Sequence, residues 1–310
     1  MQKTRSTVYF ANAWKKIKTQ KYLLLMLLPT FIILGIFNYG PMYGAIIAFK
    51  NYNPRLGIIG SPWTGLDHFR KLWGNMFFQR IFSNTISISL LHLLWGFPAP
   101  IILALMLNEI KQIKFKRTVQ TITYLPHFLS WVIIGGFLLS LLSPTRGLVK
   151  SLSYVFGFNY DRAILAEPAY FRSILVTSGI WQGVGWGSII YLASMAGINA
   201  ELYEAAEIDG ANRFRKMLNI TLPGISSTIA VLLILRVGGI MNSNFEQIFL
   251  LYTPATYRVA DVFSTYIYRE GLLKANFSYT TAIGLFQSSI NFFLIVATNW
   301  ICRKLGRAMW

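Results

Sequence analysis

The chain has 310 residues, of which 54% are hydrophobic and 13% charged, and its mean hydropathy is +0.48. This composition excludes a soluble domain and indicates a polytopic membrane protein. The formal net charge of +18 could indicate nucleic-acid binding, but the basic residues are spread over every hydrophilic segment without a nucleic-acid-binding motif. Positive-inside anchoring and contact with anionic lipid explain the charge more simply, so no nucleic-acid partner is expected.

Six apolar runs predict an all-α membrane protein with six transmembrane helices. The runs are residues 22–39, 81–107, 122–143, 174–195, 227–245 and 280–302. We expect Pro98 and Pro100 to kink the second run and Pro126 to break the third. In the fourth run Gly179, Gly183 and Gly187 follow one another at intervals of four, a pattern that predicts close packing of membrane helices.

The distribution of lysine and arginine predicts the orientation. With the amino terminus inside, the cytoplasmic segments, including a short loop at 108–121, carry 16 Lys and Arg residues. The longer external segments, of which the last is residues 246–279, carry 12. This bias indicates that both termini are cytoplasmic. We therefore predict a tail over residues 1–21, one membrane domain over 22–302 and a second tail over 303–310.

The hydrophilic loop at residues 196–226 is the most distinctive stretch. Acidic residues crowd its first half and basic residues its second half: Glu201, Glu204, Glu207, Asp209, Arg213, Arg215 and Lys216. The sequence predicts a helix over 200–208 that ends or bends at Gly210, because glycine adopts left-handed dihedral angles without penalty. A second short helix is expected over 211–219, stopping before Pro223.

The first of these helices has one face formed by Leu202, Ala205, Ala206 and Asp209, where the small alanines would let another backbone approach closely. One interpretation is an amphipathic loop on the lipid surface. Helices of that kind are usually rich in lysine and arginine, whereas this one is acidic. The second interpretation, which we favour, is a helix that enters a groove of a protein partner.

The spacing of this loop resembles the cytoplasmic coupling motif of binding-protein-dependent ABC importer permeases. The pattern is Glu-Ala-Ala, three residues, Gly, nine residues, Ile, one residue, Leu-Pro, and the matching residues are Glu204, Ala205, Ala206, Gly210, Ile220, Leu222 and Pro223. In that family the motif docks into a cleft of the ATPase subunit, and we assign Asp209 to the same contact. Many relatives carry a helix-starting proline where this chain has Ala200, so the start of the helix is left open.

Other stretches extend the resemblance over nearly the whole chain. Residues 49–53 and 65–69 resemble the external loop of sugar-type permeases. Residues 39–41, 63–69 and 124–128 look most like permeases for complex or acidic oligosaccharides, such as alginate- or pectin-derived chains. The family implies a heterodimeric core with a second permease subunit, two ATPase subunits, an extracellular solute-binding protein and a location in the bacterial plasma (inner) membrane.

No catalytic motif accompanies these features. The chain lacks Gly-x4-Gly-Lys-Ser/Thr, His-Glu-x-x-His and Gly-x-Ser-x-Gly. We therefore expect neither an enzyme nor a catalytic residue, and no cofactor bound by this chain; ATP and magnesium would be held by the partner ATPase subunits. Cys302 is the only cysteine, and His68, His92 and His127 lack metal-ligand spacing, so no metal site is expected.

The predicted spans contain more polar and aromatic side chains than packing requires, and polar groups at membrane depth are costly unless they face a partner or a wet cavity. The candidates for a saccharide pathway are Trp131, Gln182, Trp186, Arg236, Asn242, Asn244, Gln287 and Asn291. Amides would pair with hydroxyl groups, and indoles would offer flat surfaces to sugar rings. The alternative is hydrogen bonding between helices. Arg236 could line the pathway, or pair with a carbonyl or with an acid of a partner subunit.

Three other functions stay open: an ABC permease for a non-sugar solute, an ATP-independent secondary transporter or channel, and a membrane scaffold without transport. A secondary transporter would usually need coupling-ion ligands at mid-membrane. No Asp or Glu lies deep in any predicted span, which favours the ATP-driven importer.

Overall fold

The computed structural model describes residues 19–242, 244–304 and 306, so most of the predicted amino-terminal tail and the end of the carboxy-terminal tail lie outside the described residues. The described residues are nearly all helical, and their only β pairing is an isolated bridge between Lys50 and Trp63. The predicted all-α fold is therefore confirmed. The described residues form two compact units, one of residues 19–68 with 277–282 and one of those within 69–276 and 283–306.

The first unit contains a long apolar helix. In it α2 (Lys21–Leu34) continues through a π-helical turn (Gly35–Tyr39), α3 (Gly40–Met42) and a 3-10 turn (Tyr43–Phe49). The helix thus runs well beyond the span predicted at 22–39. No side chain in its most apolar window is buried within the chain, as expected for a helix that faces lipid or another subunit.

The loop that follows this helix folds back on itself beside α4 (Gly57–Gly60). Asn51 N–H donates to the Pro62 carbonyl at 2.9 Å, and the His68 ring nitrogen Nε2 lies 3.1 Å from the Lys50 carbonyl. The Lys50 ammonium donates to the carbonyls of Ile58 and Ile59. The two loop stretches that resemble the sugar-permease loop are therefore held together by hydrogen bonds.

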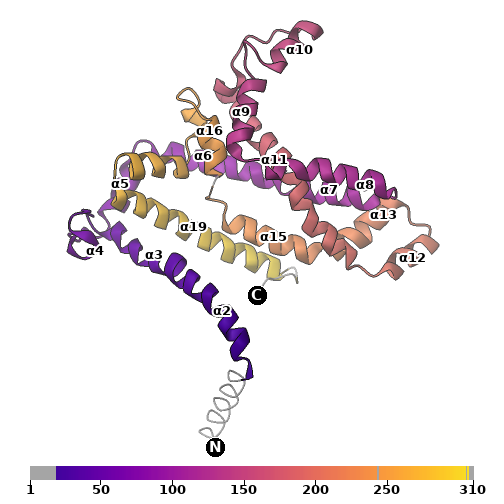
Figure 1. Ribbon diagram of the computed structural model, residues 1–310, viewed down its shortest axis with the longest axis horizontal. Coiled ribbons are helices and arrows are strands. Elements are labelled where there is room, and N and C mark those ends of the chain that lie inside the picture. The colour runs from indigo at the N-terminus through magenta and orange to yellow at the C-terminus, as the bar shows by residue number, and fades with distance from the viewer. Residues whose placement is uncertain (1–18, 243, 305, 307–310) are drawn as a thin grey trace, which may run out of the picture. The chain divides into compact units, whose positions relative to one another are not determined.

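The second unit is a helical assembly (Figure 1). Its helices are α5 (Asp67–Gly74), α6 (Phe78–Leu91), α7 (Pro98–Glu109), α8 (Ile113–Tyr124), α9 (Trp131–Leu141), α10 (Leu148–Phe156), α11 (Pro168–Ala196), α12 (Ala200–Ile208), α13 (Arg213–Lys216), α14 (Leu222–Gly224), α15 (Ser226–Gly238), α16 (Phe245–Leu251), α17 (Tyr257–Ala260), α18 (Phe263–Ile267) and most of α19 (Phe277–Lys304). Several begin where the sequence supplies a start signal: Pro168 opens α11, and the Ser130 hydroxyl caps α9.

Helix α11, with 29 residues, is the centre of this unit and packs against α7 and α8, which lie beside it in Figure 1. The predicted glycine stripe explains part of this packing. A Cβ added at Gly179 would lie 2.9 Å from the His92 ring, and one at Gly187 would lie 3.0 Å from the Pro100 ring. Gly183 has open space around it, whereas a Cβ at Gly185, outside the predicted stripe, would overlap the Thr123 carbonyl.

The count of membrane spans stays a prediction. Among the described residues, three helices are long and apolar enough to cross a membrane: Lys21–Phe49, Phe78–Glu109 and Phe277–Lys304. Two bent pairs raise the number to five if each is one span: Ile113–Phe128 with Trp131–Leu141, bent by 100°, and Arg213–Gly224 with Ser226–Gly238, bent by 59°. The first bend confirms the break expected near Pro126.

Several predicted boundaries were wrong. The loop expected at 108–121 is mostly helix, since α8 begins at Ile113. The segment 246–279 contains α16, α17 and α18, and its external location stays a prediction. The fifth span is helical only to Gly238. Pro98 and Pro100, which were expected to kink the second span, lie in the first turn of α7 and follow a π-helical turn (His92–Gly96).

The second helix of the hydrophilic loop does not stop before Pro223. It continues to Gly224 through a π-helical turn (Met217–Thr221), which widens the helix where the proline ring would otherwise meet the carbonyl four residues earlier.

Candidate functional site

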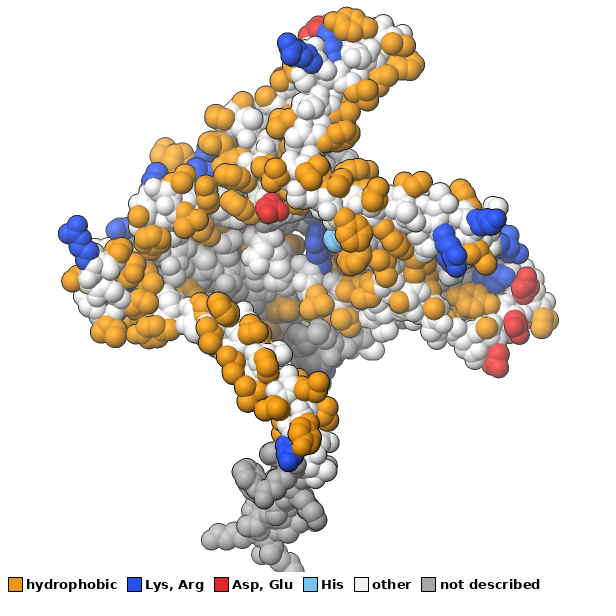
Figure 2. Space-filling view, in the orientation of Figure 1, with side chains coloured by type: hydrophobic (Ala, Val, Ile, Leu, Met, Phe, Trp, Pro, Cys, Tyr) orange, Lys and Arg blue, Asp and Glu red, His pale blue; other side chains and the backbone are white. Residues whose placement is uncertain are grey.

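The hydrophilic loop predicted to contact an ATPase forms an exposed projection. Helix α12 starts at Ala200 because the Asn199 side chain accepts a hydrogen bond from Glu201 N–H at 3.1 Å. No residue of α12 is buried. Figure 2 shows its acidic side chains gathered at one end of this unit, with basic side chains close by over α8 and α13. The asparagine before Ala200 was the sequence signal for this start.

Gly210 sets the direction in which α12 leaves the loop. Its φ of +74° lies in the left-handed region, as the sequence predicted for a glycine at a helix end. An added Cβ would meet no atom within 4 Å, so the glycine is required by its dihedral angle and not by crowding. Asn212 then caps α13 by accepting from Arg215 N–H at 2.9 Å.

The base of the projection is anchored in the membrane domain. Leu222 packs against a buried cluster that includes Ile101, Tyr191 and Ile225. The Tyr203 and Thr221 hydroxyls are 2.9 Å apart, and they connect the first helix to the second. The predicted coupling residues therefore divide by position. Glu204, Ala205, Asp209, Gly210 and Pro223 are exposed, Ala206 and Ile220 are half-buried, and Leu222 holds the base.

A cavity with a volume of about 680 Å³ lies within the second unit. Six of the eight predicted pathway residues line it: Trp131, Gln182, Trp186, Arg236, Asn242 and Asn244. They come from the start of α9, the middle of α11, the last turn of α15 and the non-helical stretch after it. In Figure 2 a basic side chain and a histidine lie together in the hollow between α11 and α15.

One wall of this cavity is aromatic. The Trp186 and His127 rings stack at 4.7 Å with an interplanar angle of 5°, and Phe128 meets Trp186 edge-on at 5.7 Å. The sharp turn between α8 and α9 places His127 there, and its buried Nδ1 has no partner among the described residues. His127, His92 and Tyr191 line the cavity but were not among the predicted pathway residues. The sequence signal that could have identified two of them is the helix break at His127 and the packing of His92 against Gly179.

Gln287 and Asn291 do not line the cavity. The Gln287 amide donates to the Met241 carbonyl at 3.0 Å, and the Asn291 side-chain carbonyl accepts from Met241 N–H at 3.0 Å. Asn291 also lies 3.4 Å from the Asn242 side chain. These two amides supply hydrogen bonds to the backbone of Met241, which lies after the end of α15. They therefore stabilise the stretch that contributes Asn242 to the cavity wall, without lining the cavity themselves.

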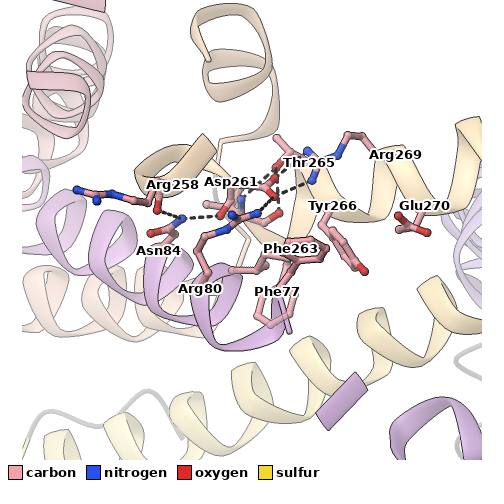
Figure 3. A network of polar contacts seen from close by, with 12 residues as sticks. Phe77, Arg80, Asn84, Arg258, Asp261, Phe263, Thr265, Tyr266, Arg269 and Glu270 are labelled. Atoms are coloured by element: carbon pink, nitrogen blue, oxygen red, sulfur yellow. Dashed lines mark hydrogen bonds and ion pairs between the residues drawn. The ribbon is translucent and has the colours of Figure 1, made fainter. Parts of the chain in front are cut away.

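A third polar site surrounds the buried carboxylate of Asp261 (Figure 3). Arg269 donates to its two oxygens at 2.8 and 2.6 Å, and the Thr265 hydroxyl donates at 2.8 Å. Arg80 of α6 lies 3.7 Å away. Burial by itself would lower the pKa of Arg269, but the Asp261 carboxylate outweighs burial and raises that pKa.

Asn84 extends this network to two further helices. Its amide donates to the carbonyls of Arg258 and Asp261 at 3.1 and 3.0 Å, and its side-chain oxygen accepts from Arg172 of α11 at 2.8 Å. The segment from α17 to α18 is thereby fastened to α6 and α11 through charge-assisted hydrogen bonds.

The comparisons with known proteins identify the family. A family model described as "Binding-protein-dependent transport system inner membrane component" matches residues 96–307. The chain belongs to this family. It is therefore an inner-membrane permease subunit of an ABC importer and not an ATPase, which agrees with the absence of an ATP-binding motif.

Two curated proteins of Bacillus subtilis (strain 168) are similar to this chain over most of their length. Protein LplB is 43% identical over 292 residues, which cover 94% of this chain and 91% of LplB. The polygalacturonan/rhamnogalacturonan transport system permease protein YteP is 43% identical over 291 residues, with 94% and 90% covered. A solved chain of a bacterial alginate ABC transporter, in complex with an alginate pentasaccharide-bound periplasmic protein, superposes with a TM-score of 0.87. It is 44% identical and covers 95% of this chain and 98% of its own.

These likenesses confirm the permease fold, the importer class and the dependence on partner subunits. The roles of individual coupling and cavity residues in this permease stay predictions. Among the described residues no group of three or more His, Cys, Asp and Glu side chains is arranged to hold a metal ion.

Proposed function

We propose that this permease carries an acidic oligosaccharide across the bacterial inner membrane, with both termini in the cytoplasm. The observation that supports this most is the cavity, whose wall combines stacked aromatic rings, three amide side chains and one guanidinium. Aromatic faces suit sugar rings, and amides suit hydroxyl groups. The names of YteP and of the solved transporter refer to polygalacturonan, rhamnogalacturonan and alginate, which are acidic saccharides.

The mechanism that we propose links the cavity to the exposed projection. A solute-binding protein delivers the saccharide from outside, and two ATPase subunits, which bind ATP and magnesium, close on the cytoplasmic side. The projection at α12 enters the ATPase, and its base, anchored by Leu222 beside α7 and α11, passes the movement to the helices that line the cavity. No cofactor is assigned to this chain.

Sugar uptake by a strain that lacks this permease tests the function. The strain should fail to take up labelled trigalacturonate or trimannuronate, and the gene supplied in trans should restore uptake. Maltotriose and sn-glycerol 3-phosphate serve as the neutral and the phosphorylated comparison, since one permease that is 26% identical to this chain is named as an sn-glycerol-3-phosphate permease. Normal uptake of both uronates by the deletion strain, with loss of another solute, would contradict the proposed substrate class.

Labelling of single cysteines tests the proposed orientation. The native Cys302 is first replaced, and single cysteines are then introduced. Ser61 lies in the predicted external loop but is buried, so we choose the exposed Ile59 in the same loop as the external position. A cysteine at Ile59 should react with an impermeant thiol reagent from outside, and one at Glu207 only after the cells are opened. The reverse pattern would place the termini outside.

A further inference from the structure

The charged side chains that line the cavity are of one sign only, which is positive. Among the described residues that line it, Arg236 is the only one with a permanent charge, and none is an aspartate or glutamate. The remaining polar side chains are amides, hydroxyls, two indoles and two histidines. The permanent charge in the cavity lining therefore comes from one guanidinium.

Arg236 forms no contact of its charged group that would stabilise the described part of the fold. It lies in the last turn of α15, its side chain is exposed, and no described residue forms a hydrogen bond or ion pair with its guanidinium. Arg269, Arg80 and Arg172 are different, because each of these guanidinium groups has a carboxylate or carbonyl partner. A charged side chain at membrane depth is costly unless it faces water or a partner, so Arg236 is retained for something that enters the cavity or for another subunit.

The aromatic wall decides between these occupants. Arg236 lines the same cavity as the stacked Trp186 and His127 rings and the Gln182 amide. An acid of a second subunit would account for the guanidinium, but it would leave the exposed indole face and the amide without a role. A sugar ring that carries a carboxylate accounts for all of them, since guanidinium and carboxylate match in geometry.

We propose that Arg236 makes this permease selective for anionic saccharides by pairing with a uronate carboxylate inside the membrane. This inference rests on the proposed function and names the residue that sets its charge preference. A phosphate group would pair with a guanidinium as well, so the shared ligand chemistry is a small oxyanion on a polyol. The aromatic wall favours the uronate over a glycerol phosphate, which has no ring to place against it.

The test compares Arg236→Gln and Arg236→Lys in the complete importer, with both permeases and the ATPase, purified without its solute-binding protein. Binding of trigalacturonate, its methyl ester and sn-glycerol 3-phosphate is measured by calorimetry. Arg236→Gln should weaken trigalacturonate binding about tenfold or more, as for loss of a charged hydrogen-bond partner, and leave the methyl ester unchanged. Arg236→Lys should keep most of the preference. Arg146→Gln, an exposed arginine outside the cavity, is the control and should change neither ligand.

Three results would overturn the inference. Equal weakening of the acid and the ester would make Arg236 a structural residue, and an unchanged preference would remove it from selection. Loss of the second permease from Arg236→Gln during purification would show that its partner is an acid of that subunit. If the wild-type importer binds glycerol phosphate and neither saccharide, the proposed function fails. If instead Arg236→Gln binds the acidic saccharide and its ester with the wild-type preference, the proposed function stands and only the role of Arg236 is wrong.

Discussion

Replacing Asp261 by asparagine should destabilise the membrane domain by about 3–5 kcal/mol, the usual effect of removing one partner of a buried ion pair. The Asp261 side chain is 1% exposed, and its carboxylate receives two hydrogen bonds from Arg269 and one from Thr265. Asparagine keeps the shape, but it cannot offset the charges of Arg269 and Arg80. The measurement is the denaturation midpoint of the purified importer, followed by the fluorescence of a thiol-reactive dye at buried Cys302.

Two further variants make this expectation specific. Asp161→Asn removes a carboxylate from an exposed pair with Lys150, in which the Asp161 side chain is 64% exposed, and should have little effect. The double change Asp261→Leu with Arg269→Leu should recover part of the stability, because no unpaired charge from that pair is left buried. An Asp261→Asn protein as stable as Asp161→Asn would show that the network does not hold the α17–α18 segment.

Gly210→Val should abolish transport by detaching the ATPase while the permease stays in the membrane. At φ +74° a β-branched residue costs about 1–3 kcal/mol, and the chain can relieve this by turning α12 away from its docking direction. Because nothing lies within 4 Å of the added Cβ, the dihedral angle alone is tested.

Glu204→Lys should weaken the same contact by reversing an exposed charge, most strongly at low salt. Co-purified ATPase, normalised to permease in the membrane, is the measurement.

Gly210→Asn provides the matched control, because asparagine tolerates the left-handed region better than other residues with a side chain. It should retain most of the ATPase and most of the uptake. Normal ATPase binding by both Gly210→Val and Glu204→Lys, with normal uptake, would show that this projection is not the coupling element.

The sequence by itself determined the class of protein and the location of the projection. Apolar runs and residue spacing are local properties, so the helical membrane fold, the break near Pro126 and the turn at Gly210 could be predicted from neighbouring residues alone. The motif from Glu204 to Pro223 is equally local. The predicted bounds of its second helix were wrong at both ends, since the helix begins at Arg213 and a π-helical turn carries it past Pro223.

Only the tertiary structure decided which polar side chains share a site. Asn84 and Arg236 both lie in apolar runs, yet Asn84 bonds backbone groups more than 170 residues away while Arg236 faces a cavity without a described partner. Gln287 and Asn291 were indistinguishable from Gln182 in sequence, but they satisfy the backbone of Met241. The buried Asp261 network joins residues from three distant segments, so no pattern within one stretch of the sequence predicts it. The physical reason is that burial and hydrogen-bond pairing depend on which helices meet, and that is set by small residues such as Gly185 at the crossings.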